Sequence, residues 1–210
     1  NVSVKASGAA RTFDANGMTG VANITSDRST NVLNITNLGT TDVATGFNKT
    51  NNIVADLTAK YTNAALAGAT DTVTVNLTGG VGSAASATGD NTIKVYSTSG
   101  TNAAENLAVS VTGGDAYLGA LLSHNNTTSN TSTLEKLTVT GDKDLTILTA
   151  LDFTVAAATQ AIVDASAMTG DLSVIVSEAI LANIKGGSGK DTISVIGGNF
   201  TSTDTVDGGA

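Results

Sequence analysis

Short runs in which apolar and polar residues alternate recur along almost the whole chain. The apolar positions are mostly Val, Ile and Leu, and Gly, Asn, Asp or Thr separates one run from the next, which is typical of β-strands. This pattern predicts strands at residues 2–5, 21–25, 32–36, 72–77, 92–96, 107–112, 136–140, 145–148, 172–177 and 192–196.

The fold that these strands predict is all-β, as a right-handed parallel β-helix or irregular β-solenoid in two sections. Only 3% of the residues are aromatic, so the large anchors of many globular cores are nearly missing. A core of small and β-branched side chains suits the narrow interior of stacked β-coils. The alternative is a pair of tandem β-sandwiches, which would pair their strands mainly antiparallel.

Helical signals are few. Residues Asp115–His124 have an Asp at a candidate N-cap and an apolar spacing that predicts two turns of helix. Residues Thr159–Met168 fit a helix or a strand equally well. An Asn/Thr-rich stretch at 124–133 predicts a loop between a β-rich section, 1–123, and a solenoid section, 134–210.

One internal echo joins the two sections. Phe13–Ile24 and Val163–Val174 share the pattern Asp-Ala-x-x-Met-Thr-Gly, in which the only two methionines occupy the same place. We interpret this echo as a coil corner seen twice, with each Met filling a gap. Asp14 and Asp164 would cap the turn by accepting a backbone hydrogen bond, or would ligate a metal.

Composition excludes several classes of partner. The 210 residues include no Cys and no Pro, and the formal net charge is −8. This acidity argues against nucleic acid, whose phosphates require Lys and Arg. No apolar run reaches the length of a membrane span, so we expect no membrane insertion. The chain begins at Asn1 and stops inside a Gly-rich motif, so we expect it to be a fragment of a longer protein.

The residues that usually carry catalysis are scarce. His124 is the only histidine, and no cysteine accompanies it, which argues against a zinc site. The nucleophile pattern Gly-x-Ser-x-Gly is absent from the sequence. We therefore expect no enzyme, although the chain could still adjoin a secreted protease or lipase domain outside it.

The clearest candidate site is a Gly-rich stretch near the end of the chain. Residues 186–194, GGSGKDTIS, fit the nonapeptide G-G-x-G-x-D-x-U-x, which binds calcium when it is repeated. Ile193 stands at the apolar position U. A partial second copy follows, so the candidate calcium residues are Gly186, Gly187, Gly189, Asp191, Asp207, Gly208 and Gly209.

Calcium is the expected cofactor because it prefers hard oxygen ligands. The expected site is one ion faced by the carboxylates of Asp191 and Asp207 and by the carbonyls of Gly187 and Gly189. The second turn is expected 18 residues after the first, as two nonapeptides require. The alternative is a Gly-rich turn that closes a coil without metal.

The combination VDASAMTGDLSV…ANIKGGSGKDTISV resembles the surface-layer (S-layer) proteins of Gram-negative bacteria, of the Caulobacter and Campylobacter type with RTX-like nonapeptides. The resemblance is sharpest from 163 to 210. It implies type I secretion, calcium-dependent folding outside the cell, and self-assembly into a coat on the bacterial cell surface. The implied partners are further copies of the protein, and lipopolysaccharide through regions outside this chain.

Two features depart from that family. The nonapeptides are sparse, and Lys190 places a positive charge where the family often has Asn or Ala, beside the expected cation. The function expected from the resemblance is a structural segment of a secreted S-layer protein. The alternative is a repeat region of a large type I-secreted adhesin, which would extend and bind a partner.

Overall fold

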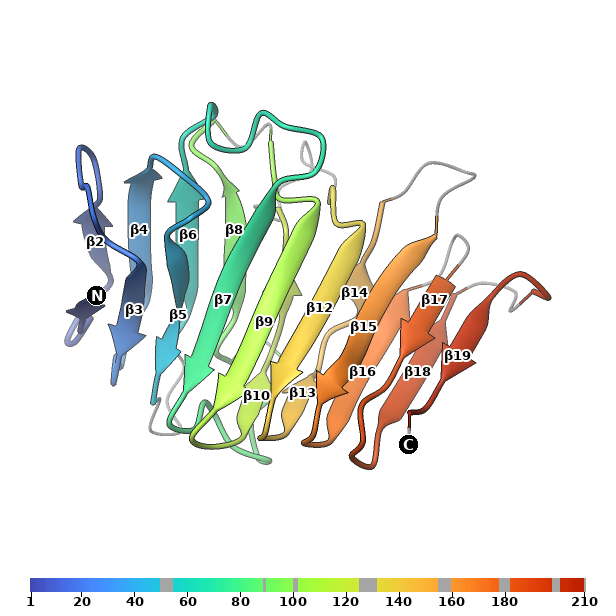
Figure 1. Cartoon of the computed structure of the whole chain (residues 1–210). Coiled ribbons are helices and arrows are strands. Elements are labelled where there is room, and N and C mark those ends of the chain that lie inside the picture. The colour runs from blue at the N-terminus through green and yellow to red at the C-terminus, as the bar shows by residue number, and fades with distance from the viewer. Residues whose placement is uncertain are drawn as a thin grey trace.

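The strands of this protein stack in parallel, each beside a strand one coil further along the chain (Figure 1). The computed structural model describes residues 1–49, 55–88, 90–99, 102–124, 132–154, 160–177, 182–197 and 201–209. Within those ranges the chain forms no helix, and thus none that is long and apolar enough to cross a membrane.

The largest sheet has nine strands in sequence order and runs from one end of the molecule to the other (Figure 1). Its strands are β1 (Val2–Val4), β3 (Asn23–Asp27), β5 (Ala44–Asn48), β7 (Thr72–Thr78), β9 (Asn106–Thr112), β12 (Lys136–Gly141), β15 (Ala161–Met168), β17 (Ala182–Lys185) and β19 (Thr205–Asp207).

Two five-stranded sheets share the other side of the coil. The first contains β2 (Arg11–Asp14), β4 (Leu33–Leu38), β6 (Leu57–Tyr61), β8 (Ile93–Ser97) and β11 (Leu121–Leu122). The second contains β10 (Ala116–Leu118), β13 (Leu145–Ile147), β14 (Leu151–Asp152), β16 (Leu172–Ser177) and β18 (Thr192–Ile196). The chain crosses repeatedly between the nine-stranded sheet and one of these two, a path compatible with a β-solenoid.

All ten strands predicted from the alternating pattern are present. The helix predicted at Asp115–His124 is wrong, because β10 and β11 occupy that stretch and pair with β13 and β8. The ambiguous stretch that ends at Met168 is a strand, β15, although residue 159 lies outside the described ranges. The tandem-sandwich alternative is also wrong, since every described strand pair is parallel.

Coil length varies along the stack. In-register partners are 22 residues apart at both ends and 34 apart in the middle: Val2 with Ile24, Asn183 with Thr205, and Thr72 with Asn106. The nine-stranded sheet continues through both predicted sections, because β9 pairs directly with β12 over six residues. The predicted boundary loop falls mostly on residues 125–131, outside the described ranges.

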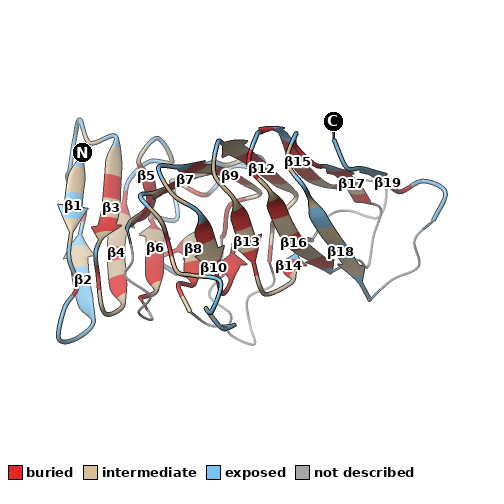
Figure 2. Ribbon diagram, turned by 90° about the horizontal axis from the view of Figure 1, so that it is seen from below, coloured by how far each residue is buried: buried red, intermediate tan, exposed pale blue. Residues whose placement is uncertain are grey.

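The core is one continuous cluster of mostly aliphatic side chains between the sheets. Figure 2 shows that buried residues occur in strands along most of the stack. Alternate residues of each strand enter it, as Val73, Val75 and Leu77 do from β7. Phe47 and Tyr61 are its largest fully buried side chains. Stacking in register places like-sized aliphatic residues above one another, which fills a narrow interior without aromatic anchors.

The outer face of the nine-stranded sheet carries short polar side chains. Asn76 donates a hydrogen bond to Asn23 (2.7 Å), which in turn donates one to Asn1 (3.0 Å). Gly46 pairs in register with Thr25 on one side and with Asn76 on the other. A Cβ at Gly46 would overlap the carbonyl oxygen of Asn76. The close approach of β5 and β7 therefore requires glycine at this position.

Replacing Gly46 tests this close packing. We expect Gly46→Ala to lower the free energy of unfolding by about 1–3 kcal/mol, because the added methyl must push two paired strands apart. Denaturant unfolding measures the change. Gly39→Ala is the control, since a Cβ there has no atom within 4 Å. Equal stability of the two variants would contradict the packing argument.

Asp204 links the last coil to the preceding coil by a hydrogen bond, and its ionisation makes the stability of the fold depend on pH. The residue is 8% exposed, and its carboxylate accepts the N–H groups of Thr201 (2.6 Å) and Ala182 (2.7 Å). These two hydrogen bonds hold the pKa of Asp204 below its ordinary value, and the bond from Thr201 lowers the pKa most. The stabilisation is thus complete above about pH 3.9 and is lost as the pH falls through the lower folded-state pKa.

We therefore expect Asp204→Asn to be less stable than the wild type at pH 7, because an amide cannot accept both N–H bonds equally. The difference should shrink as the pH falls below about 3.9. Unfolding by denaturant at neutral and acidic pH measures it, with the exposed Asp142→Asn as control. A difference that is constant with pH would contradict the role of the ionised carboxylate.

Candidate functional site

The Gly-rich stretch lies in the turn between β17 and β18. In-register pairing of Lys185 with Asp207 brings the partial second copy beside it, and Gly186 donates its N–H to the carbonyl of Asp207 (2.7 Å). A Cβ at Gly186 would lie 2.5 Å from the carbonyl oxygen of Gly208. The two Gly turns therefore stack directly, at a spacing of 22 residues and not the expected 18.

Asp191 has both of its carboxylate oxygens engaged by backbone. Oδ2 accepts the N–H of Gly187 (2.7 Å) within the same turn, and Oδ1 accepts the N–H of Leu172 (2.8 Å) from the preceding coil. The carboxylate thus closes its own turn and links two coils. Ile193, two residues on, packs half-buried against the core, as expected for position U.

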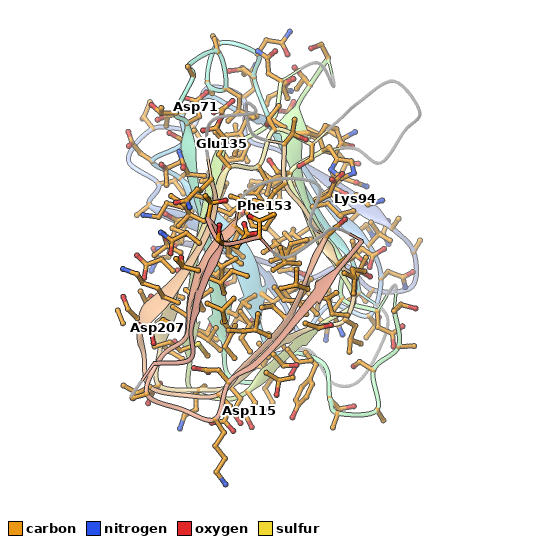
Figure 3. All side chains as sticks on the ribbon, turned by 90° about the vertical axis from the view of Figure 1, so that its right-hand side faces the viewer. Asp71, Lys94, Asp115, Glu135, Phe153 and Asp207 are labelled. Carbon is orange, nitrogen blue, oxygen red and sulfur yellow. The ribbon has the colours of Figure 1, made fainter. Side chains whose placement is uncertain are left out.

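A hollow of about 310 Å³, here called the glycine hollow, lies beside this turn. Its lining includes Gly186, Gly187, Gly209, Asp207 and Lys185, but not Asp191. Figure 3 shows Asp207 at the side of the coil. Asp207 also accepts the N–H of Gly209 (3.0 Å), two residues on.

The donor set of the glycine hollow is a poor match to calcium. Calcium takes six to eight oxygen ligands, usually with several carboxylates. The hollow offers one carboxylate, Asp207, with Lys185 beside it, and the described residues contain no group of three or more His, Cys, Asp or Glu able to hold a metal ion. The ion shared by Asp191 and Asp207 stays a prediction.

The remaining predicted residues lie close by. Gly189 packs against the preceding coil, where a Cβ would overlap the carbonyl oxygen of Gly170. The neighbouring Lys190 is exposed, and its backbone N–H donates to the carboxylate of Asp171 (2.7 Å). The Gly residues of the motif are thus required by close packing between coils, whatever else they do.

The same kind of corner recurs along the stack, which sequence reasoning missed. Asp115 accepts the N–H of Asp144 (3.3 Å), and Asp144 accepts the N–H of Asp171 (2.8 Å). These carboxylates, with Asp171 and Asp191, form a corner row in which each bonds the backbone of an adjoining coil. Figure 3 shows Asp115 at one end of the cross-section, with Asp71 and Glu135 at the other.

A sequence signal for the corner row does exist. Each of its strands follows a Gly and an Asp: GGDAYL at 113–118, GDKDLTI at 141–147, TGDLSV at 169–174 and GKDTISV at 189–195. Only the last belongs to a full calcium nonapeptide. The other three corners use their Asp to bond the backbone of the following coil, whereas Asp191 closes its own turn and bonds the preceding coil. In all four corners the carboxylate has a structural role toward backbone N–H groups.

The echoed aspartates also close turns. Asp14 accepts the N–H of Asn16 (3.0 Å), and Asp164 accepts the N–H of Ser166 (3.2 Å), so both form Asx-turns. The turns lie in different sheets, however, in β2 and β15. Met168 is buried but Met18 is 37% exposed, so the interpretation that both methionines fill a gap is wrong for Met18.

Comparison with known proteins identifies no relative: no family model, no curated protein and no solved structure matches the chain. What the residues can do must therefore be argued from their own geometry.

The turn-closing role of Asp191 predicts an effect that does not need calcium. We expect Asp191→Ala to lower the free energy of unfolding by about 1–3 kcal/mol in the presence of a chelator, because the N–H groups of Gly187 and Leu172 lose their acceptor. Denaturant unfolding measures this change. Asp142→Ala is the control, since Asp142 is exposed and makes only a 3.9 Å ion pair. An Asp191 variant that matches the wild type in chelator would refute it.

Proposed function

We propose that this chain is a structural segment of a secreted bacterial S-layer protein, which self-assembles into a lattice on the cell surface. In the same proposal the parallel stack is a right-handed β-helix. The observation that carries the proposal is a continuous stack of parallel coils with a broad face of short polar side chains, most of them Asn, Thr and Ser.

The outer face of the nine-stranded sheet is the surface proposed to make lateral contacts. A shallow groove of about 350 Å³ on it is lined only by Asn, Thr and Ser. Further along the sheet, Thr138 and Thr140 continue this surface between core residues of β12. Threonine packs well on pleated sheet, and the groove, whose lining side chains are uncharged, lets copies of an acidic protein approach there without direct charge repulsion.

Calcium dependence is part of the proposal. In this view the ion is held where the stacked Gly turns meet, with further oxygens from a neighbouring turn or a neighbouring molecule completing the shell. Such a site would be filled at extracellular calcium concentrations and would stabilise the assembled form by mass action. Supporting this view are the full nonapeptide and the close stacking of Gly186 on Gly208.

Electron microscopy of the full-length protein tests the assembly. We expect ordered two-dimensional arrays in millimolar calcium, lost on adding a chelator. Isolated fibres that bind host cells would favour the adhesin alternative, and secreted hydrolase activity would favour the neighbour of an enzyme domain. Arrays that persist in chelator would overturn calcium dependence alone.

A pair of variants tests the proposed contact surface. We expect Thr138→Lys to abolish or shrink the arrays, because it puts a long, hydrated side chain into the contact between adjoining copies. Thr146→Lys is the matched control, since Thr146 lies outside the core on β13, in a different sheet. Both variants should melt near the wild-type temperature. Arrays that survive Thr138→Lys unchanged would contradict the use of this face.

A further inference from the structure

A second hollow lies far from the Gly corners, where the first five-stranded sheet ends. That sheet stops at β11, which pairs with β8 on one side and has no described strand on the other. The next coil departs to the other sheet, where β14 pairs with β16. Between the two sheets lies a recess of about 470 Å³, here called the notch. Its volume is within the range of about 300–1,000 Å³ that is usual for small-molecule sites.

The floor of the notch is apolar. Leu121 belongs to the core, so Ala120 and Leu122 on either side of it face away from the core. They are nevertheless only 7% and 8% exposed, because the neighbouring coil shelters them. Lys94 pairs in register with Leu122 and stands at the wall. Figure 3 shows Lys94 on the opposite side of the coil from Asp207.

His124 lines the notch, and one of its ring nitrogens lacks a hydrogen-bond partner among the described residues. The side chain is 7% exposed, and its Nδ1 has no hydrogen-bond partner among the described residues. A buried nitrogen without a partner is costly. Nδ1 is closed off from solvent, so a ligand in the notch gains this bond only when the ring turns toward it. Burial lowers the pKa of His124, so the ring is neutral at pH 7. A hydroxyl suits either tautomer, since it can donate or accept.

Two carboxylates complete the polar lining. Asp56 is half-buried, and its Oδ1 accepts the N–H of Thr92 (3.0 Å). Its Oδ2 makes no hydrogen bond with the described residues. Asp152, from β14, lines the other side. The notch thus combines two acceptors, the Lys94 ammonium donor and the neutral ring of His124.

The charges of these side chains determine which ligands the notch favours. Two carboxylates against one ammonium disfavour an anion such as phosphate, and the ammonium disfavours a metal cation. Carboxylates accept from neighbouring hydroxyls, Lys94 donates to ring or hydroxyl oxygens, and the Ala120–Leu122 floor suits a face of C–H groups. The geometry points to the notch as a binding site for a short neutral saccharide.

The affinity expected is modest. No Phe, Tyr or Trp among the described residues lines the notch. The affinity therefore gains nothing from stacking on such a ring, and a Kd on the order of 1 mM is expected. The notch site does not depend on the assembly proposed above, because its residues lie in a different sheet from the outer face.

Nuclear magnetic resonance titration of the 210-residue chain tests the site. The probes are methyl glycosides of glucose, galactose, mannose and N-acetylglucosamine, raised to tens of millimolar. We expect at least one glycoside to shift the His124 ring resonances and the amides of Thr92 and Leu122 in a saturable way. Shifts caused only by phosphate or calcium, or by no probe, would overturn the proposal.

Two conservative variants make the test specific. Asp56→Asn keeps an acceptor for Thr92, and Lys94→Gln keeps the side-chain length, so both should fold. Each should raise the glycoside Kd at least tenfold, whereas Asp142→Asn and Lys143→Gln, exposed and outside the notch, should leave it unchanged. A Kd unaltered by both notch variants, in proteins that melt like the wild type, would also overturn the proposal.

Discussion

Parallel pairing between one coil and the next is the interaction on which the rest of this structure depends. Every described strand bonds to a strand about one coil away, so backbone groups are satisfied between coils and not within local hairpins. A shift of one residue would turn the inward side chains of a strand outward. The aliphatic cluster, the Gly contacts and the corner carboxylates all require the same register.

The corners show how that register is held where strands end. Asp115, Asp144, Asp171 and Asp191 each bond the backbone of an adjoining coil, which supplies an acceptor to amides that the sheet leaves free. Asp suits this hydrogen-bonding role because its short side chain reaches a nearby backbone N–H. The excess of Asp over Glu in the composition therefore has a structural cause that does not involve a ligand.

The strands could be predicted from the sequence, but the pairing between them could not. Alternation marked strands such as β7 and β16, but Tyr117, Leu118, Leu121 and Leu122 fit a helical spacing as well as two short strands. Only pairing with β13 and β8 decides between them. The glycines around Asp191 were found by motif, yet tight coil contact and calcium binding require the same residues. The notch could not be predicted from the sequence, because residues from four coils form it.

The last coil of the 210-residue chain is less covered than the middle coils, and this affects how the chain opens. At the last coil, Val206 and Ile196 are 45% and 47% exposed, whereas the middle coils are sealed on both sides. In a fold where each coil contacts only its neighbours, opening proceeds one coil at a time from the weakest end. In the 210-residue chain we therefore expect amide hydrogen exchange to be graded along the axis, fastest in β18 and β19 and slowest around β9. Local opening of the last coil thus precedes the unfolding of the stack as a whole.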